Sequence, residues 1–285
     1  MKSFWLVAAA LALAPLAAPA AGPGAVRKQI ESSMLVTGEV QIDAQGQVEK
    51  ISLDQPERLP AGIVKFVQGQ VQDWTFEPVL VGGTAVPAMS RMSLRVIGKR
   101  LDKDSITIGI RHANFLGTEP GEGEAVSSIE MPPPRYPSSA ARDGAQGSVY
   151  LMLRVGQQGT VEDVVVEQIN LRIVGSEKQM ENWRRQFADA SLSAARRWTF
   201  APPTAGELAG EPYWSLRVPV EYMMGSDAPT ARYGQWHTYV PGPRQRAPWA
   251  GEESPGFSPD TLAGGGVYMA GRSKGLRLMT RLEEG

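Results

Sequence analysis

The chain has 285 residues, of which 42% are hydrophobic and 21% are charged, a composition typical of a globular protein of about two domains. Its 29 lysines and arginines nearly balance 30 aspartates and glutamates, so the net charge of -1 gives no electrostatic basis for binding nucleic acid or an anionic membrane. Cysteine is absent and only His112 and His237 are histidines, which excludes disulfides, thiolate catalysis and cysteine-ligated zinc and argues against a multi-histidine metal site.

The N-terminus resembles a secretory signal peptide. Lys2 precedes an uninterrupted apolar run over residues 4–14, Pro15 ends that run, and Ala-Pro-Ala at residues 18–20 has the small-x-small form that signal peptidase cleaves. We therefore predict a signal peptide over residues 1–21 and export of the mature protein. The alternative is an uncleaved inner-membrane anchor, which the alanine-rich and proline-containing segment favours less.

Residues 30–98 predict a first small module. Alternating apolar residues on both sides of a turn at Gly46 predict a β-hairpin. Ile63, Val67, Val71 and Trp74 then follow at spacings of 4, 4 and 3, which places them on one face of a helix. Residues 88–97 predict a third strand.

Residues 99–131 predict an extra strand and a linker. Isoleucines alternate with other residues over 106–111, as in a strand, whereas residues 114–130 are rich in Gly, Glu and Ser and have no period. We expect a strand first and an irregular connection after it.

Residues 132–224 predict a second module with the same order of elements. Alternating residues 149–155 and 161–166 flank a turn at Gly159, and a helical spacing of apolar residues runs from Trp183 to Trp198. A third strand contains Ser-Leu-Arg-Val at residues 215–218, a tetrapeptide that also occurs at residues 93–96.

A repeated pentapeptide indicates that the two modules arose by duplication. Trp-Thr-Phe-Ala-Pro at residues 198–202 has a near copy, Trp-Thr-Phe-Glu-Pro, at residues 74–78. Alignment of the two copies leaves about 11 extra residues in the second module, which we place in an enlarged loop over 170–181. The predicted fold class is α+β, with two small modules that each pack one amphipathic helix on a short antiparallel sheet of about three strands.

The aromatic residues of the two modules are interpreted as core rather than as ligand-binding residues. One helix on three strands encloses little volume, so large aromatic side chains must supply much of the buried surface. The predicted structural core residues are Trp74, Phe76, Trp183, Phe187, Trp198 and Phe200.

Residues 225–285 have neither a helical nor a strand period. Glycine, proline and arginine alternate there with isolated aromatic residues. We expect this Gly/Pro-rich tail to be disordered or loosely packed on the modules.

No motif supports an enzymatic activity. A near match to a phosphate-binding loop at residues 266–273 has Arg272 in place of the required lysine and no preceding βαβ context. No Gly-x-Ser-x-Gly motif is present. The acidic residues on predicted strands, Asp43, Asp54, Asp163 and Glu167, are interpreted as solvated. We predict a protein that is not an enzyme, with no cofactor, no metal and no small-molecule substrate.

The second module resembles the TonB C-terminal domain family. The resemblance rests on Tyr136-Pro137, Gly-Ser-Val at 147–149, Gly-Thr-Val-Glu-Asp-Val at 159–164, the pentapeptide at 198–202 and Val-Pro-Val-Glu-Tyr at 218–222. The first module is a degenerate version without the Tyr-Pro pair.

The resemblance implies a periplasmic domain of a Gram-negative bacterium that binds outer-membrane receptors. In this family a short extended segment of the receptor pairs with the final strand, here Tyr213–Tyr222, by strand addition. Pro219 suits an edge strand but removes one donor. By position, the residues implied to contact the partner are Tyr136, Leu216, Arg217, Val218, Val220 and Tyr222.

Two other roles remain open at this point. The modules could form a homodimer through the same sheet edge and serve envelope assembly. An uncleaved N-terminal segment would instead make the protein an inner-membrane energy transducer, although the long Pro-rich spacer of such proteins is absent.

Overall fold

A computed structural model describes residues 30–100, 106–117, 121–225, 233–271 and 275–282. The predicted signal peptide lies outside the described residues. The predicted α+β class is confirmed, because antiparallel sheets dominate and the helices are few. The first half of the chain forms β1 Glu31–Ile42, β2 Val48–Leu53, η1 Pro56–Arg58, α2 Ala61–Gln72, β3 Val79–Val81, β4 Thr84–Val86, β5 Ala88–Arg100 and β6 Ile106–Leu116. The remainder forms β7 Ser127–Glu130, α3 Ser138–Arg142, β8 Gly147–Gly156, β9 Val161–Leu171, α4 Glu177–Ala195, β10 Thr199–Ala201, β11 Tyr213–Tyr222, β12 His237–Tyr239, η3 Pro259–Thr261 and β13 Tyr268–Met269.

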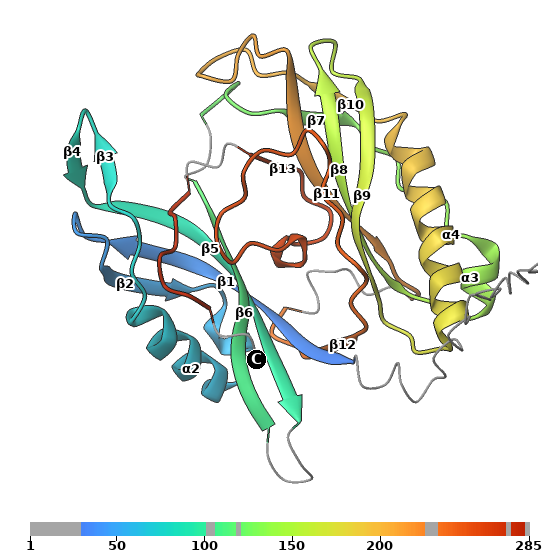
Figure 1. The fold of residues 1–285 in the computed structure, drawn as a ribbon, viewed down its shortest axis with the longest axis horizontal. Coiled ribbons are helices and arrows are strands. Elements are labelled where there is room, and N and C mark those ends of the chain that lie inside the picture. The colour runs from blue at the N-terminus through green and yellow to red at the C-terminus, as the bar shows by residue number, and fades with distance from the viewer. Residues whose placement is uncertain (1–29, 101–105, 118–120, 226–232, 272–274, 283–285) are drawn as a thin grey trace, which may run out of the picture.

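Two larger sheets form the body of the molecule (Figure 1). In the first, the strand order is β12-β1-β5-β6, and β2 also pairs with β1. In the second, the order is β13-β11-β8-β9. Each sheet buries one face under a single long helix, α2 or α4, and the two hydrophobic cores are separate. The two helices lie on the outer sides, and the C-terminal segment, in orange and red, runs between the sheets.

The repeated pentapeptide makes the same backbone contact in both halves. In the first, the Phe76 N–H donates to the carbonyl oxygen of Gly46 at 2.8 Å, and in the second the Phe200 N–H donates to that of Gly159 at 2.8 Å. Both glycines have positive φ, +83° and +73°. The pentapeptide therefore ties the end of each helix region to the hairpin turn of the same sheet, which explains why glycine and pentapeptide recur together.

This contact predicts a cost for any side chain at Gly159. A Cβ there would overlap the carbonyl oxygen of Phe200, and the positive φ would be strained as well. We expect Gly159→Ala to lower the free energy of unfolding by at least about 2 kcal/mol, from about 1 kcal/mol of left-handed strain and 1 kcal/mol or more of overlap. Urea denaturation followed by tryptophan fluorescence measures it.

Gly144 provides the matched control. It also has positive φ, +69°, but an added Cβ meets nothing within 4 Å. Gly144→Ala should therefore cost only the backbone strain, about 1 kcal/mol. Equal losses for the two variants would contradict the close approach at Gly159.

The extra residues of the second half lengthen its elements, so the expected enlarged loop over 170–181 is wrong. Strand β9 has 11 residues against 6 in β2, and α4 has 19 against 12 in α2. Helix α4 begins at Glu177, within the expected loop, because Ser176 and Gln179 form a capping box. Each of the two side chains accepts a hydrogen bond from a backbone N–H near the helix start.

The predicted linker over 114–130 also contains regular structure. Strand β6 continues to Leu116, and β7 pairs with β10, with Ser128 opposite Phe200. All side chains of β7 are exposed, so its sequence has no apolar alternation to reveal it. Backbone pairing with β10 defines this strand instead.

The C-terminal tail is ordered over its described residues, which corrects the expectation of disorder. Strand β12 pairs with β1, β13 pairs with β11, and Leu278 bridges to Phe76. The buried apolar residues of this tail are Tyr239, Val240, Ala247, Leu262, Ala270, Leu276 and Leu278. Its order comes from contacts with both sheets, because the segments are too short to form structure alone.

A buried carboxylate anchors the tail between the sheets. Asp260 lies 3.1 Å from the His112 ring and 3.2 Å from the Tyr239 hydroxyl, and Arg95 lies 3.9 Å away. Burial alone would raise the pKa of Asp260, but the hydrogen bond with His112 and the charge of Arg95 outweigh it and hold the pKa well below its usual value. The group therefore stays ionised and links the tail to the first sheet.

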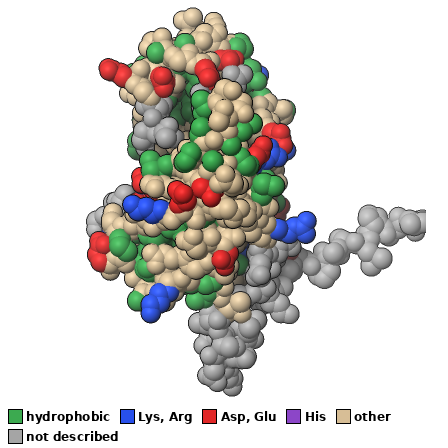
Figure 2. Space-filling view, turned by 90° about the vertical axis from the view of Figure 1, so that its left-hand side faces the viewer, with side chains coloured by type: hydrophobic (Ala, Val, Ile, Leu, Met, Phe, Trp, Pro, Cys, Tyr) green, Lys and Arg blue, Asp and Glu red, His purple; other side chains and the backbone are tan. Residues whose placement is uncertain are grey.

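The face of the molecule seen in Figure 2 has no strongly charged region. Acidic and basic side chains are interspersed there among small groups of hydrophobic residues. This distribution agrees with the nearly neutral composition and gives no charged docking surface on that face.

Candidate partner-binding edge

Strand β11 has one side fully paired and one side lightly paired. Its whole length pairs with β8, from Tyr213 opposite Gly156 to Tyr222 opposite Gly147. On the other side β13 pairs only at Leu216 and Arg217. The outer side of β11 is therefore only partly paired, and β9 ends the sheet on its far side.

The backbone groups of β11 alternate between these two sides. The carbonyl oxygens of Ser215 and Pro219 accept hydrogen bonds from the N–H groups of Ala270, at 2.8 Å, and Gly265, at 3.3 Å. Since residues of an antiparallel strand direct their backbone groups to alternate neighbours, the odd-numbered residues of β11 face outward and the even-numbered residues face β8.

This alternation explains why Pro219 is tolerated. Its nitrogen lies on the outward side, where no hydrogen bond to β8 is lost. A partner strand could therefore pair with Ser215, Arg217 and Glu221 as donors, and with Pro219 as an acceptor only.

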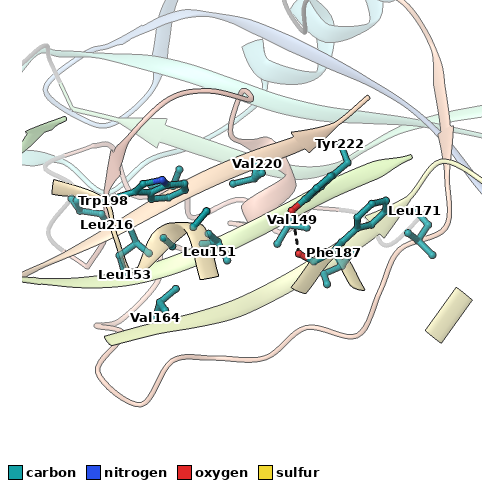
Figure 3. Packing of buried hydrophobic residues seen from close by; sticks show 14 of the residues in the cluster. Val149, Leu151, Leu153, Val164, Leu171, Phe187, Trp198, Leu216, Val220 and Tyr222 are labelled. Carbon is teal, nitrogen blue, oxygen red and sulfur yellow. Dashed lines mark hydrogen bonds between the residues drawn. The ribbon is translucent and has the colours of Figure 1, made fainter. Parts of the chain in front are cut away.

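Most of the side chains predicted to contact a partner lie in the core. Leu216, Val218, Val220 and Tyr222 are all at most 8% exposed and belong to the cluster under α4. Figure 3 shows Leu216, Val220 and Tyr222 among the β8 side chains of that cluster. These side chains position β11, whereas its outward main-chain groups face β13 and the adjoining tail.

Tyr136 joins the same core rather than the outer edge. Its ring meets those of Phe187 and Tyr222 edge to face, at 5.9 and 5.4 Å between centroids, and its hydroxyl donates to the carbonyl oxygen of Ala145 at 2.5 Å. Burial raises the pKa of Tyr136. Burial also raises the pKa of Tyr222 to about 12, although its hydrogen bond with Ser191 opposes the shift. Both tyrosines are neutral structural residues at pH 7.

Arg217 is the predicted site residue on the opposite face of the sheet. Its guanidinium donates twice to the Glu167 carboxylate, at 2.7 and 3.1 Å, and once to Glu253 of the tail at 2.5 Å. It also lies 4.4 Å from the ring centre of Phe257. Glu167 is completely buried, so its interpretation as a solvated residue is wrong. Arg217 and Glu167 are 50 residues apart in the sequence, so no local pattern could predict their ion pair.

Sequence reasoning also missed the residues that cover the β11 edge. Gly265, Tyr268 and Ala270 come from the tail, where no strand period exists. The near phosphate-loop motif at residues 266–273 contains Tyr268 and Ala270, and Tyr268–Met269 within it form strand β13 instead.

The two sheets differ at this position. Strand β5 holds the same place in the first sheet that β11 holds in the second, and its outer side is paired with β6 from Arg91 to Arg100. The corresponding outer side of β11 carries only the short β13. Of the two equivalent strands, β11 is therefore the one with the shorter outer neighbour.

Within the described ranges, no group of three or more His, Asp or Glu side chains is arranged to hold a metal ion. The helices among those same residues are too short or too polar to cross a membrane.

One part of the chain is similar to a family of known proteins. Residues 132–224 match the profile of the Gram-negative bacterial TonB protein C-terminal. The chain is 35% identical over 106 residues to the protein TonB of Xanthomonas campestris pv. campestris strain B100, a match that covers 36% of this chain and 40% of that protein. It is 28% identical over 96 residues to the protein tonB2 of Pseudomonas aeruginosa, covering 34% of this chain and 30% of that protein.

A solved structure, the solution NMR structure of the Pseudomonas aeruginosa TonB CTD, is 19% identical and covers 36% of this chain and 90% of that chain, with a TM-score of 0.26. That score is too low to support a comparison of folds. The family profile ends at residue 224, two residues after β11, so the matched region contains both β8 and the candidate edge. Residues 132–224 of this chain are similar to the TonB C-terminal domain family.

Proposed function

We propose that residues 132–224 form a periplasmic binding module of TonB-dependent transport, which engages an extended segment of an outer-membrane receptor or another envelope protein by strand addition to β11. The observation that carries the proposal is the outer side of β11, whose main-chain groups are satisfied by only a short strand. Main-chain groups along a sheet edge are the usual template for an added strand.

The family similarity of the same residues supports this proposal, since the region matched by the profile includes β11. The signal-like N-terminus supports export to the periplasm. A binding role also agrees with the absence of enzyme motifs in the sequence. We propose no receptor identity and no transported substrate.

The test uses peptides altered only in their backbone. Synthetic peptides that span the periplasm-facing extended segments of TonB-dependent receptors are titrated against the full chain, and binding is followed by fluorescence anisotropy. In the tightest binder, single residues are then N-methylated one at a time. Every second methylation should weaken binding, by about tenfold for loss of one or two hydrogen bonds to β11, because only alternate N–H groups face β11.

The intervening methylations are the matched control, since they change the same chemistry on N–H groups that face away. They should alter the dissociation constant little. Equal losses at all positions, or none at any, would contradict strand addition and favour recognition through side chains.

A further inference from the structure

The tail of this chain already occupies the edge to which a partner would bind. Met269 lies opposite Leu216 and Tyr268 opposite Arg217. The N–H groups of Ala270 and Gly265 extend this pairing to the carbonyl oxygens of Ser215 and Pro219. The outward groups that the proposed function assigns to a partner are thus the ones that the tail uses.

The side chains of the tail segment also fit the sheet. Val267 and Met269 pack against the core cluster under α4, and the Tyr268 hydroxyl donates to the carbonyl oxygen of Ala263 at 3.0 Å. On the opposite face Glu253 and Phe257 of the tail contact Arg217. The tail therefore meets β11 along its edge and on one face.

The pairing of β13 with β11 is much shorter than the pairing of β6 with β5 at the equivalent place in the first sheet. β6 pairs with β5 over the whole span from Arg91 to Arg100, whereas β13 consists of two residues. Glycines at 264–266 and 271 flank β13 on both sides, and glycine makes a chain costly to order. A strand of this kind can leave the edge without unfolding the sheet.

We infer that β13 is an intramolecular competitor, which holds the outer edge of β11 until an extended peptide displaces it. This inference rests on the proposed function of the same edge. The displacing strand would place an apolar side chain opposite Leu216, as Met269 does now, and would need no acceptor opposite the Pro219 nitrogen.

A proline exchange in β13 tests the competition. The Tyr268 N–H faces β11, because Tyr268 lies two residues from Ala270, whose N–H faces β11. Tyr268→Pro should release β13, and Met269→Pro, at an N–H that faces away, is the matched control. The probe is a labelled peptide of residues 264–271, added to the full chain. We expect it to bind Tyr268→Pro about tenfold more tightly than the wild type or Met269→Pro.

An engineered disulfide that holds β13 on β11 tests the opposite change to its release by proline. Because the chain has no cysteine, Ser215→Cys with Ala270→Cys would create its only disulfide, across an antiparallel pair whose Cα separation, about 5.5 Å, suits one. The oxidised chain should not bind the peptide, and reduction should restore wild-type binding. Ser32→Cys with Thr238→Cys, which lie opposite each other in β1 and β12, fixes the tail elsewhere and should leave binding unchanged.

Hydrogen exchange of the Arg217 amide gives a readout that needs no peptide. It should be slow in the wild type and about tenfold faster in Tyr268→Pro. Equal exchange in these two chains, or equal peptide binding by the oxidised and reduced disulfide variant, would overturn the inference. If the tail peptide binds Tyr268→Pro but receptor peptides bind neither that variant nor the wild type, the proposed function fails while the competition stands.

Discussion

Replacing Trp198 with alanine should lower the free energy of unfolding by about 3–5 kcal/mol, the usual cost of truncating a buried tryptophan. The Trp198 side chain is 2% exposed and lies in the core under α4. Its indole N–H also donates to the carbonyl oxygen of Pro132 at 2.9 Å, so the substitution leaves that acceptor without its partner. Urea denaturation followed by circular dichroism measures the loss.

Trp236 is the control for this prediction. It lies in the tail and is 38% exposed. Trp236→Ala should change the free energy of unfolding by no more than about 0.5 kcal/mol, as expected for surface positions. Similar losses of unfolding free energy for both variants would contradict the role of Trp198 as a buried core residue.

Replacing Arg217 with methionine should cost about 3–5 kcal/mol, because it leaves a buried carboxylate without a cation. Glu167 is completely buried and Arg217 is 6% exposed. Both hydrogen bonds to the Glu167 carboxylate come from Arg217. Equilibrium unfolding of the single variant at pH 7 checks the prediction.

A double variant separates the lost charge from the lost packing. Arg217→Met with Glu167→Leu removes the buried charge with its partner, so much of the lost stability should return. Arg277→Met is the exposed control, since its pair with Glu77 is 53% and 63% exposed, and it should cost less than about 1 kcal/mol. A double variant no more stable than Arg217→Met would contradict the buried-charge explanation.

Elements with a local period could be predicted from the sequence. The hairpin around Gly46, the helix face of Ile63 and Val67, and the helix that contains Trp183 all show spacings that secondary structure imposes. The pentapeptide could be assigned to the core because a thin module needs large aromatic side chains. Its hydrogen bond to the turn glycine could not be foreseen, because it joins positions 30 or more residues apart.

Elements defined by distant pairing could not be predicted. β7, β12 and β13 have four, three and two residues, too few for a period to appear. The alignment of the two halves counted the extra residues of the second but did not show that they extend β9 and α4.

The sequence assigned the candidate site to β11 and to the side chains of that strand. The sequence resemblance selected Leu216, Val218, Val220 and Tyr222, whose side chains lie in the core. Which main-chain groups of β11 face outward depends on its register with β8 and on the tail, and neither is encoded locally. The binding role of all these residues remains a prediction.

The measurement that tests strand addition most directly is backbone amide NMR of the full chain with a bound receptor peptide. The account predicts new protection from hydrogen exchange, beyond that given by the tail, at the outward amides of Ser215, Arg217 and Glu221, with contacts from the peptide backbone to the same residues. Protection and contacts confined to β9 or α4, with β11 and β13 unchanged, would contradict it.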